Sequence, residues 1–447
     1  MEQKRYFKMS HVQIIALGFF LIIMTGAMLL MLPISTQDGQ GADFLEALFT
    51  ATSASCVTGL IVRDTATYWS YFGQGVILTM IQIGGLGFMT IATMFFLILR
   101  KRVHLRGREL LTESINVSQV GGIVRLAKKI IFGTIFIEGA GALLLMIRFV
   151  PKYGAIGIWM SVFHSVSAFC NAGFDLMGQF TGAYSSLTAF VDDWLVSGVV
   201  MALIVIGGVG FIVWDDILTY HFSFKKYHLH SKIVLGMTFL MIFGGALLFL
   251  VVERNATGAG MSFDNQILAA LFDSVTARTA GFNTVDTAGL SDAGKLITIV
   301  LMFVGGSPGS TAGGVKTTTI AVLLLFSFSY MRSDKSISVF GRTLEEDALR
   351  KASAVFFTNL SLALTVTVLI SSIQVIPVMD IVFETFSAIG TVGMSTGITR
   401  ELNDVSRVLI IFLMYCGRVG SLSFANALAG KRKTAPVRNA VEKITIG

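Results

Sequence analysis

The sequence predicts an all-α polytopic membrane protein, built from one unit that is repeated four times around a common axis. Two features carry this prediction: apolar runs of membrane-spanning length, and a short phrase that recurs at a nearly constant interval. Of the 447 residues, 54% are hydrophobic and 14% are charged, whereas roughly a quarter of the residues are charged in soluble domains. Residues 12–32, 233–252 and 352–379 carry no formal charge. A helix of about 20 such residues spans a bilayer, and the first run is too long for the apolar core of a signal peptide.

The repeated phrase ends in a glycine each time. Its four copies occupy 49–59, 163–173, 271–281 and 383–393. The closing glycines are 114, 108 and 112 residues apart, and such a period indicates one structural unit built four times. In the third copy the anchoring apolar residue is either Leu271 or Phe272, so its register stays open between the two.

Each unit is predicted to contain a span, a segment too short to span, and a second span. The short segments, near 43–58, 159–170, 264–277 and 381–390, are expected to be re-entrant half-helices. Two spans per unit return the chain to its starting side, so the four units share one orientation around an axis along the membrane normal. We expect one transmembrane domain with eight spans and four half-helices. Its units lie at about 9–100, 129–220, 232–331 and 352–430, and a tail follows at 431–447.

The second spans of units one, two and four are expected at 72–99, 194–214 and 408–429.

Lysine and arginine residues are distributed unequally between the two sides of the membrane in this arrangement. The N-terminus, the linkers at 100–129, 221–232 and 332–351, and the tail hold 24 of the 34, against eight in the segments around the phrases. By the positive-inside rule, both termini and all three linkers are expected in the cytoplasm. The net charge of +7 is therefore assigned to topology and not to nucleic-acid binding.

Cysteine and histidine give no sign of a disulfide or zinc site. Cys56, Cys170 and Cys416 lie in or beside apolar segments, no CxxC occurs, and the six histidines form no ligand set. The sequence also contains no recognisable nucleophile–base pair or acidic metal cluster. We therefore expect that the protein is not an enzyme and that this chain holds no organic cofactor.

The half-helices are expected to aim their C-terminal ends at the common axis, where their partial negative charge favours a cation. The extended residues beyond each end can point rings of carbonyl oxygens at the axis and replace the water shell of a monovalent cation, and the glycine permits the backbone angles required. Close helix packing through small residues is the alternative explanation of the phrase. The predicted ion-binding residues are Cys56, Val57, Thr58, Gly59, Cys170, Asn171, Ala172, Gly173, Arg278, Thr279, Ala280, Gly281, Gly390, Thr391, Val392 and Gly393.

Thr391-Val392-Gly393 resembles the filter core of potassium channels, and the whole layout is similar to the Trk/Ktr/HKT superfamily of potassium transporters. Within it, the chain is most similar to the KtrB membrane subunit of bacterial plasma membranes. The resemblance covers nearly the full length and implies four M1–P-loop–M2 repeats around a pseudo-fourfold pore. It also implies potassium as the transported ion, because a glycine stands at all four filter positions, whereas a serine at the first goes with sodium.

The second span of unit three is too long for one straight helix. Of the 35 residues at 296–330 only Lys316 is charged, and as a helix they would extend about 52 Å, against about 30 Å of hydrocarbon. The composition at 305–316 breaks helices and cannot face lipid. The resemblance implies a flexible gate beneath the filter, formed by Gly305, Gly306, Ser307, Pro308, Gly309, Ser310, Thr311, Ala312, Gly313, Gly314 and Lys316. A nucleotide-binding P-loop at 309–317 is the rival, disfavoured because Val315 separates the glycine from the lysine.

Arg418 replaces a glycine in the cluster that each second span carries: Gly84-Gly85-Leu86-Gly87, Gly207-Gly208-Val209-Gly210, Gly305-Gly306-Ser307-Pro308-Gly309 and Gly417-Arg418-Val419-Gly420. A buried arginine at membrane depth is costly and functional by default. We expect it just below the filter, where it donates hydrogen bonds to the gate and opposes cation passage. Snorkelling to the inner interface is the alternative.

Together these features predict potassium uptake through a filter pore with an intramembrane gate. The resemblance further implies a homodimer with one pore per protomer, activation by sodium, and a cytosolic nucleotide-binding ring of the KtrA or KtrC type. The basic linkers and the tail from Lys431 are the expected docking surfaces for this ring. The alternative function is a cation-coupled secondary transporter with alternating access, in which Glu138 or Asp273 carries a proton or sodium.

Overall fold

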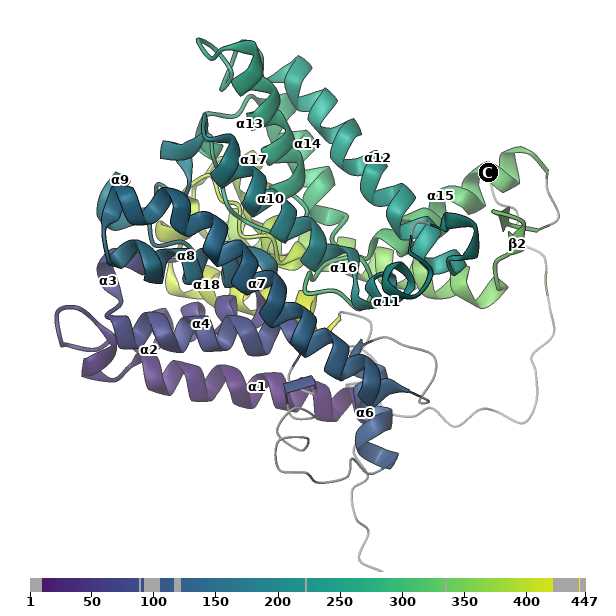
Figure 1. Cartoon of the computed structure of the whole chain (residues 1–447), viewed down its shortest axis with the longest axis horizontal. Helices are drawn as coiled ribbons and strands as arrows, with labels where there is room; N and C mark the ends of the chain where they lie inside the picture. Colours follow the sequence, from purple (N-terminus) through teal and green to yellow (C-terminus); the bar gives the residue numbers. More distant parts are fainter. Residues whose placement is uncertain are drawn as a thin grey trace, which may run out of the picture.

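The computed structural model describes residues 10–87, 90–91, 105–115, 122–221, 223–333, 336–420 and 442. These residues are mostly helical (Figure 1). Strands β1 (Ser338–Val339) and β2 (Arg342–Thr343) form one antiparallel hairpin in the linker between units three and four. The predicted all-α class is confirmed.

The first helix of every unit has membrane-spanning length. These helices are α1 (His11–Leu30), α7 (Ile123–Tyr153), α12 (Leu229–Val252) and α16 (Glu346–Ile373). Within the described residues, they contain the four unbroken segments that are long and apolar enough to cross a bilayer. The predicted first spans are therefore confirmed.

The half-helices follow at the predicted places: α2 (Phe44–Cys56), α8 (Ile156–Phe169), α13 (Phe263–Thr276) and α17 (Val378–Gly390). Each has 13 or 14 residues, which is too few to span. Polar N-caps fix two of the starts. The Asp43 carboxylate accepts a hydrogen bond from the Leu45 amide, and the Ser262 hydroxyl accepts one from the Asn265 amide.

The second helices are shorter than predicted. They are α4 (Tyr71–Leu86), α10 (Trp194–Val209), α14 (Asp292–Phe303) and α18 (Asp404–Val419). Each begins at a polar N-cap whose side chain accepts a backbone hydrogen bond, namely Ser70, Asp193, Ser291 and Asn403. A helix of 16 residues extends only about 24 Å, so α4, α10 and α18 stop short of the full hydrocarbon thickness.

The prediction of one span over 194–214 is wrong in its geometry, because the chain turns inside it. Gly210 adopts φ 102°, and α11 (Phe211–Tyr220) leaves α10 at 95°. The helices of units one and four end in the same way at Gly87 (φ 78°) and Gly420 (φ 94°). Positive φ is easily adopted only by glycine, so the last glycine of the cluster ends the helix in units one, two and four. The parts of the predicted spans at 92–99 and 421–429 lie outside the described residues.

In unit three the predicted break is confirmed, since α14 ends at Phe303 and α15 (Thr317–Met331) begins after an irregular segment. We call residues 304–316 the crossing loop. The remaining described helices are α3 (Thr65–Tyr68), α6 (Leu105–Ile115), α9 (Gly178–Thr181) and 3₁₀ turns at Pro33–Ser35, Thr188–Phe190, Phe224–Lys226, Thr287–Gly289 and Ile398–Arg400.

The four units close into a ring, in which each second helix packs against the half-helix of the next unit. Helix α4 contacts α8, α10 contacts α13, α14 contacts α17, and α18 returns to α2. Aromatic residues of the half-helices, such as Phe49, Phe163 and Phe383, are fully buried. The half-helices therefore form the centre of the molecule.

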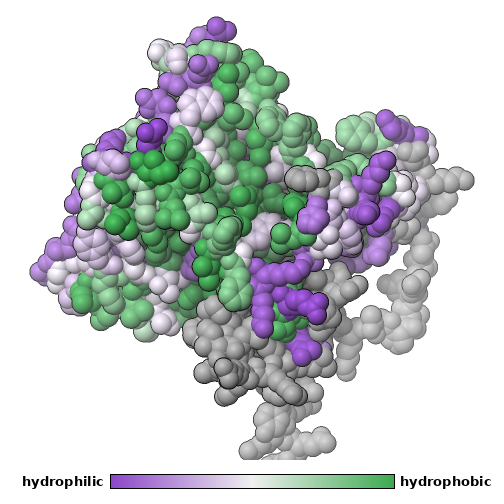
Figure 2. All heavy atoms as spheres, in the orientation of Figure 1, coloured by the Kyte–Doolittle hydropathy of each residue, from purple (hydrophilic) through white to green (hydrophobic). Residues whose placement is uncertain are grey.

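The outer face of this ring is apolar. Large side chains stand exposed on the first helices, including Phe136 on α7 (76% exposed) and Val251 on α12 (70%). Figure 2 shows apolar residues over the middle of the molecule and polar residues toward its margins. Such an extended apolar belt is stable in lipid and not in water.

Candidate ion-conduction site

Four short segments follow the half-helices and meet at the centre of the ring; we call 56–59, 170–173, 278–281 and 390–393 the filter segments. Each has the same backbone course. The second residue is in the left-handed region, with φ 57° at Val57, 58° at Asn171, 74° at Thr279 and 51° at Thr391. Left-handed geometry is costly in branched residues and persists only where the surroundings impose it. Because the same geometry recurs in all four segments, the site imposes it on each of them.

The closing glycines also share left-handed angles, with φ between 69° and 96°. They form a closed circle of contacts: a methyl group added at Gly59 would lie 2.6 Å from the carbonyl oxygen of Ala172 in unit two. The other three glycines meet the next unit in the same way, Gly173 against Ala280, Gly281 against Val392, and Gly393 against Thr58. The backbones are thus too close for any side chain at these positions.

The carbonyl oxygens of this ring are left free by the way the segments are held. The amides of Thr58, Ala172 and Val392 donate to carbonyls inside their own half-helices at 2.8–2.9 Å. Within the described residues, no hydrogen bond is donated to the carbonyl oxygens of Thr58, Ala172, Ala280 or Val392. Buried carbonyls are normally paired. A ring of unpaired ones can coordinate a cation that has shed its water.

The structure decides the register of the third copy. Phe272 is fully buried, as Phe49 is, while Leu271 is half-buried. The third copy is therefore one residue shorter between its aromatic anchor and Gly281. The end of α13 absorbs the difference, because the Ala280 amide bonds to Thr276, four residues back, where the other copies reach five residues back.

Three predicted filter residues direct their side chains away from the ring, so that only their backbones can serve it. The Arg278 guanidinium donates to the hydroxyl of Thr238 on α12 at 3.5 Å. Cys170 Sγ lies 3.8 Å from a carboxylate oxygen of Glu138. The side chain of Cys56 is fully buried and does not line the vestibule. By contrast, the side chains of Asn171 and Thr279 hydrogen-bond to each other across units two and three at 3.1 Å.

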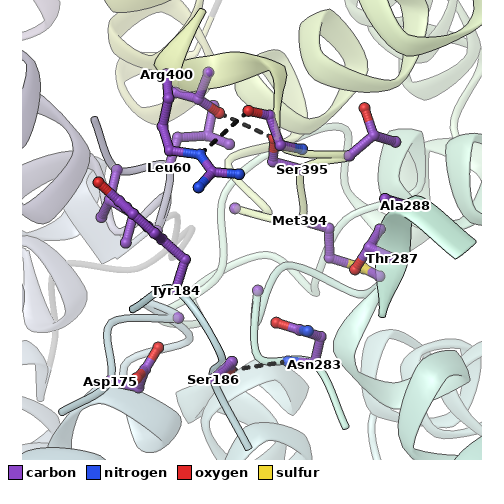
Figure 3. Close-up of a pocket in the computed structure, with 18 of the residues that line it drawn as sticks. Leu60, Asp175, Tyr184, Ser186, Asn283, Thr287, Ala288, Met394, Ser395 and Arg400 are labelled. Atoms are coloured by element: carbon purple, nitrogen blue, oxygen red, sulfur yellow. Dashed lines mark hydrogen bonds between the residues drawn. The ribbon is translucent and has the colours of Figure 1, made fainter. Parts of the chain in front are cut away.

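A cavity of about 320 Å³ opens beyond the glycines, on the side away from the half-helices. We call it the vestibule (Figure 3). All four filter glycines line it, together with Asp175 and residues from every unit. The sequence did not reveal the vestibule, because its wall consists of loops that are brought together only by the ring.

The glycine clusters of the second helices have a packing role that the sequence analysis missed. A side chain at Gly84 would collide with the carbonyl of Ser55 at the end of α2. Gly207 and Gly417 stand against the ends of α8 and α17 in the same way. Their recurrence 24 to 34 residues after each filter glycine was the signal for this contact.

The crossing loop lies against the base of the filter segments. Its Thr311 hydroxyl donates to the Phe169 carbonyl at the end of α8 (3.1 Å), and its Ser307 amide donates to Gly208 (3.0 Å). On the other side of the ring, a methyl group at Gly314 would lie 2.9 Å from the carbonyl of Gly390. The loop therefore runs beneath the filter from unit four to unit two.

Two positively charged side chains hold the crossing loop in place. The Lys316 ammonium donates to the loop carbonyls of Ala312 (2.8 Å) and Gly313 (3.1 Å). The Arg418 guanidinium donates to Thr311 of the loop and also to Gly84 and Gly85 at the end of α4. Arg418 thus lies beside the loop, as the sequence predicts, and its side chain does not extend to an interface.

The geometry of residues 309–317 does not fit a nucleotide-binding P-loop. Helix α14 precedes the loop where a P-loop would follow a strand, and Lys316 is occupied by the loop's own carbonyls. Among the described residues, no group of three histidine, cysteine or acidic side chains could hold a metal ion.

The acidic residues of the alternative transport mechanism lie outside the filter ring. Glu138 is buried between units one and two, where it accepts a hydrogen bond from Gln82 at 3.3 Å. Asp273 lies with Glu253 at a cavity of about 20 Å³ between α12 and α13. Neither lines the vestibule.

The known proteins that are similar to this chain are cation transport proteins. A family model described as TrkH, cation transport protein, matches residues 3–431. The chain is 43% identical to the potassium/sodium uptake protein NtpJ of Enterococcus hirae, over 98% of both chains. It is 40% identical to the Ktr system potassium uptake protein B of Bacillus subtilis, over 93% of this chain and 92% of that one. The crystal structure of the potassium transporter TrkH from Vibrio parahaemolyticus has the same fold, with a TM-score of 0.75 at 16% identity over 95% of this chain and 86% of that one.

Proposed function

Since this chain belongs to the TrkH family of cation transport proteins, we propose that it is the membrane subunit of a potassium uptake system. The observation that carries the proposal is the closed ring of unpaired carbonyls at the four filter glycines. Potassium loses its water shell in such a ring and regains equivalent oxygen contacts. The relatives named for potassium uptake support the choice of ion.

The crossing loop is the gate in this proposal, with the residues 305–314, Lys316 and Arg418 as its working parts. Held as it is, the loop lies across the path of an ion that has left the filter. Opening requires release of the Arg418 contacts with unit one and with Thr311. We therefore favour a gated pore over a transporter with alternating access, because the loop can move while the ring stays fixed.

The proposal extends to the assembly. Three relatives carry the name of a Ktr system, which supports a complex of several components. We expect this complex in a bacterial plasma membrane. We expect a homodimer, a cytosolic nucleotide-binding ring of the KtrA or KtrC type, and activation by sodium. Both termini would be cytoplasmic. The ring would dock on the basic linkers and on the tail from Lys431. Of these segments, residues 100–104, 116–121, 222, 334–335, 431–441 and 443–447 lie outside the described residues.

The first test is ion selectivity in the Gly59→Ser variant. A side chain at residue 59 would press on the Ala172 carbonyl and widen the ring, so we expect sodium to enter where the parent chain admits potassium. The measurement is potassium and sodium flux into proteoliposomes of the purified chain. It is repeated with the cytosolic ring if the chain alone gives no flux.

Gly39→Ser is the matched control, because Gly39 has φ 70° with nothing within 4 Å. It should leave selectivity unchanged. A parent chain that moves no cation even with the cytosolic ring would overturn the proposed function, and equal effects of the two variants would place selectivity outside the ring.

Potassium uptake should also depend on pH through the vestibule. Asp175 lies beyond the filter, outside the spans, and burial together with the nearby Asp64 carboxylate raises the pKa of Asp175 to about 7. The carboxyl is neutral below this pH and negative above it. We expect the KM for potassium to fall about twofold from pH 6 to pH 8, as one added charge near the path predicts.

Asp175→Asn should flatten this profile. Asp38→Asn is the control, since hydrogen bonding lowers the pKa of Asp38, which stays ionised across this range. An unchanged profile in Asp175→Asn would show that another group is responsible.

A further inference from the structure

One loop of unit two reaches all three other units at the mouth of the vestibule. We call residues 182–187 the mouth loop. The Tyr184 amide donates to the Asp64 carboxylate of unit one (2.8 Å), and its hydroxyl donates to the Val62 carbonyl (3.4 Å). The Ser186 hydroxyl accepts a hydrogen bond from the Asn283 amide of unit three at 3.2 Å (Figure 3). The loop is thereby fixed across three units.

Two residues of the mouth loop that make these contacts have left-handed backbone angles. Tyr184 has φ 64° and Ser186 has φ 49°. Left-handed angles cost free energy in residues other than glycine and persist where the surroundings impose them. The loop therefore has one enforced shape, and the Tyr184 ring has one enforced place.

That place supports Arg400 of unit four. The guanidinium carbon lies 4.3 Å from the centre of the Tyr184 ring, which is cation–π geometry. The Arg400 Nε also donates to the Gly397 carbonyl at 3.4 Å. Figure 3 shows the side chain lying between Tyr184 and the fourth unit at the cavity wall. Of the described residues that line the vestibule, Arg400 is the single basic one, and Asp175 and Asp286 are the acidic ones.

We propose that Arg400, held on the Tyr184 ring, sets cation entry at the outer mouth by placing a fixed positive charge in the vestibule. A fixed charge lowers the local concentration of every cation. Because Coulomb energy is proportional to the ion's charge, it repels a divalent cation twice as strongly as potassium. Arg400 is therefore a specificity-determining residue that keeps divalent cations from blocking the mouth at modest cost to potassium. This inference rests on the proposed function.

The test compares potassium uptake and its block by barium in cells that lack other potassium uptake and express the full chain. Arg400→Gln should lower the KM for potassium about twofold to threefold at low ionic strength, as one charge near the path predicts. It should tighten barium block by about the square of that factor, about fourfold to ninefold. Both effects should shrink in added choline chloride, since salt screens them.

Two further variants and a control sharpen the test. Arg400→Lys keeps the charge and should behave like the parent, whereas Tyr184→Leu frees the guanidinium and should give a partial effect. Arg63→Gln is the matched control, because Arg63 also lies over a tyrosine ring, 5.2 Å from that of Tyr68, but does not line the vestibule.

The outcomes separate the two proposals. If the parent chain takes up potassium but Arg400→Gln changes neither the KM for potassium nor the block by barium, the role of Arg400 is overturned. The proposed function is then unaffected. Equal shifts in potassium and barium affinity also overturn it, because a fixed charge must act more strongly on the divalent ion. A parent chain without any cation uptake overturns both proposals.

Discussion

A Gly281→Ala chain should retain its fold and lose most potassium uptake, to below about a tenth of the parent rate, because a filter carbonyl ring tolerates no displacement. A methyl group at residue 281 would collide with the Val392 carbonyl and stand 3.2 Å from the Cα of Gly393. Units three and four would have to separate at the ring. Uptake of potassium by purified chain in proteoliposomes, with the cytosolic ring present, measures the effect.

The control for Gly281→Ala lies in the same unit. Gly260 has φ 80°, nearly the 82° of Gly281, but nothing lies within 4 Å of an added methyl group. Both variants carry the same backbone strain, about 1–3 kcal/mol, and Gly281→Ala adds the collision with Val392. The thermal stability of Gly281→Ala should therefore fall further than that of Gly260→Ala. If Gly260→Ala loses as much uptake as Gly281→Ala, the loss comes from strain and the ring contact is irrelevant.

An Arg418→Gln chain should conduct potassium faster than the parent without activation. The arginine joins the crossing loop to the end of α4 through the carbonyls of Thr311, Gly84 and Gly85. Hydrogen bonds from charged groups contribute about 1.5–3 kcal/mol each, so loss of one already shifts the balance toward an open loop about tenfold. Potassium flux of the chain without its cytosolic ring is the measurement.

Two substitutions separate the causes of the Arg418 effect. Arg418→Lys keeps the charge but cannot reach three carbonyls at once, so it should resemble glutamine if the hydrogen bonds hold the gate and the parent if the charge is the barrier. Arg148→Gln removes an arginine paired with Asp193 at 3.1 Å, away from the loop, and should change nothing. Unchanged flux in Arg418→Gln would reject its role in gating.

The half-helices were predictable because a repeated phrase fixes both their number and their ends. Their bounds differ from the prediction by a few residues at most, as at α13 (Phe263–Thr276). The break at the crossing loop was predictable too, since five glycines and Pro308 are incompatible with a lipid-facing helix.

The turn at Gly210 and the vestibule were not predictable in this way. A glycine inside an apolar run fits a closely packed helix and a left-handed break equally well, and only neighbouring backbone decides between them. The vestibule depends on contacts such as Tyr184 with Val62, which lie 122 residues apart. Such contacts follow from ring closure and leave no local pattern.

The contact of α18 with α2 has a consequence for biogenesis. The first half-helix lacks its neighbour until the last second helix has been made, and about 350 residues separate the two. At 5–20 residues per second, synthesis of that interval takes roughly 20 to 70 s. The carbonyl ring is therefore among the last features to form, and a chain that stops before α18 leaves one side of α2 uncovered.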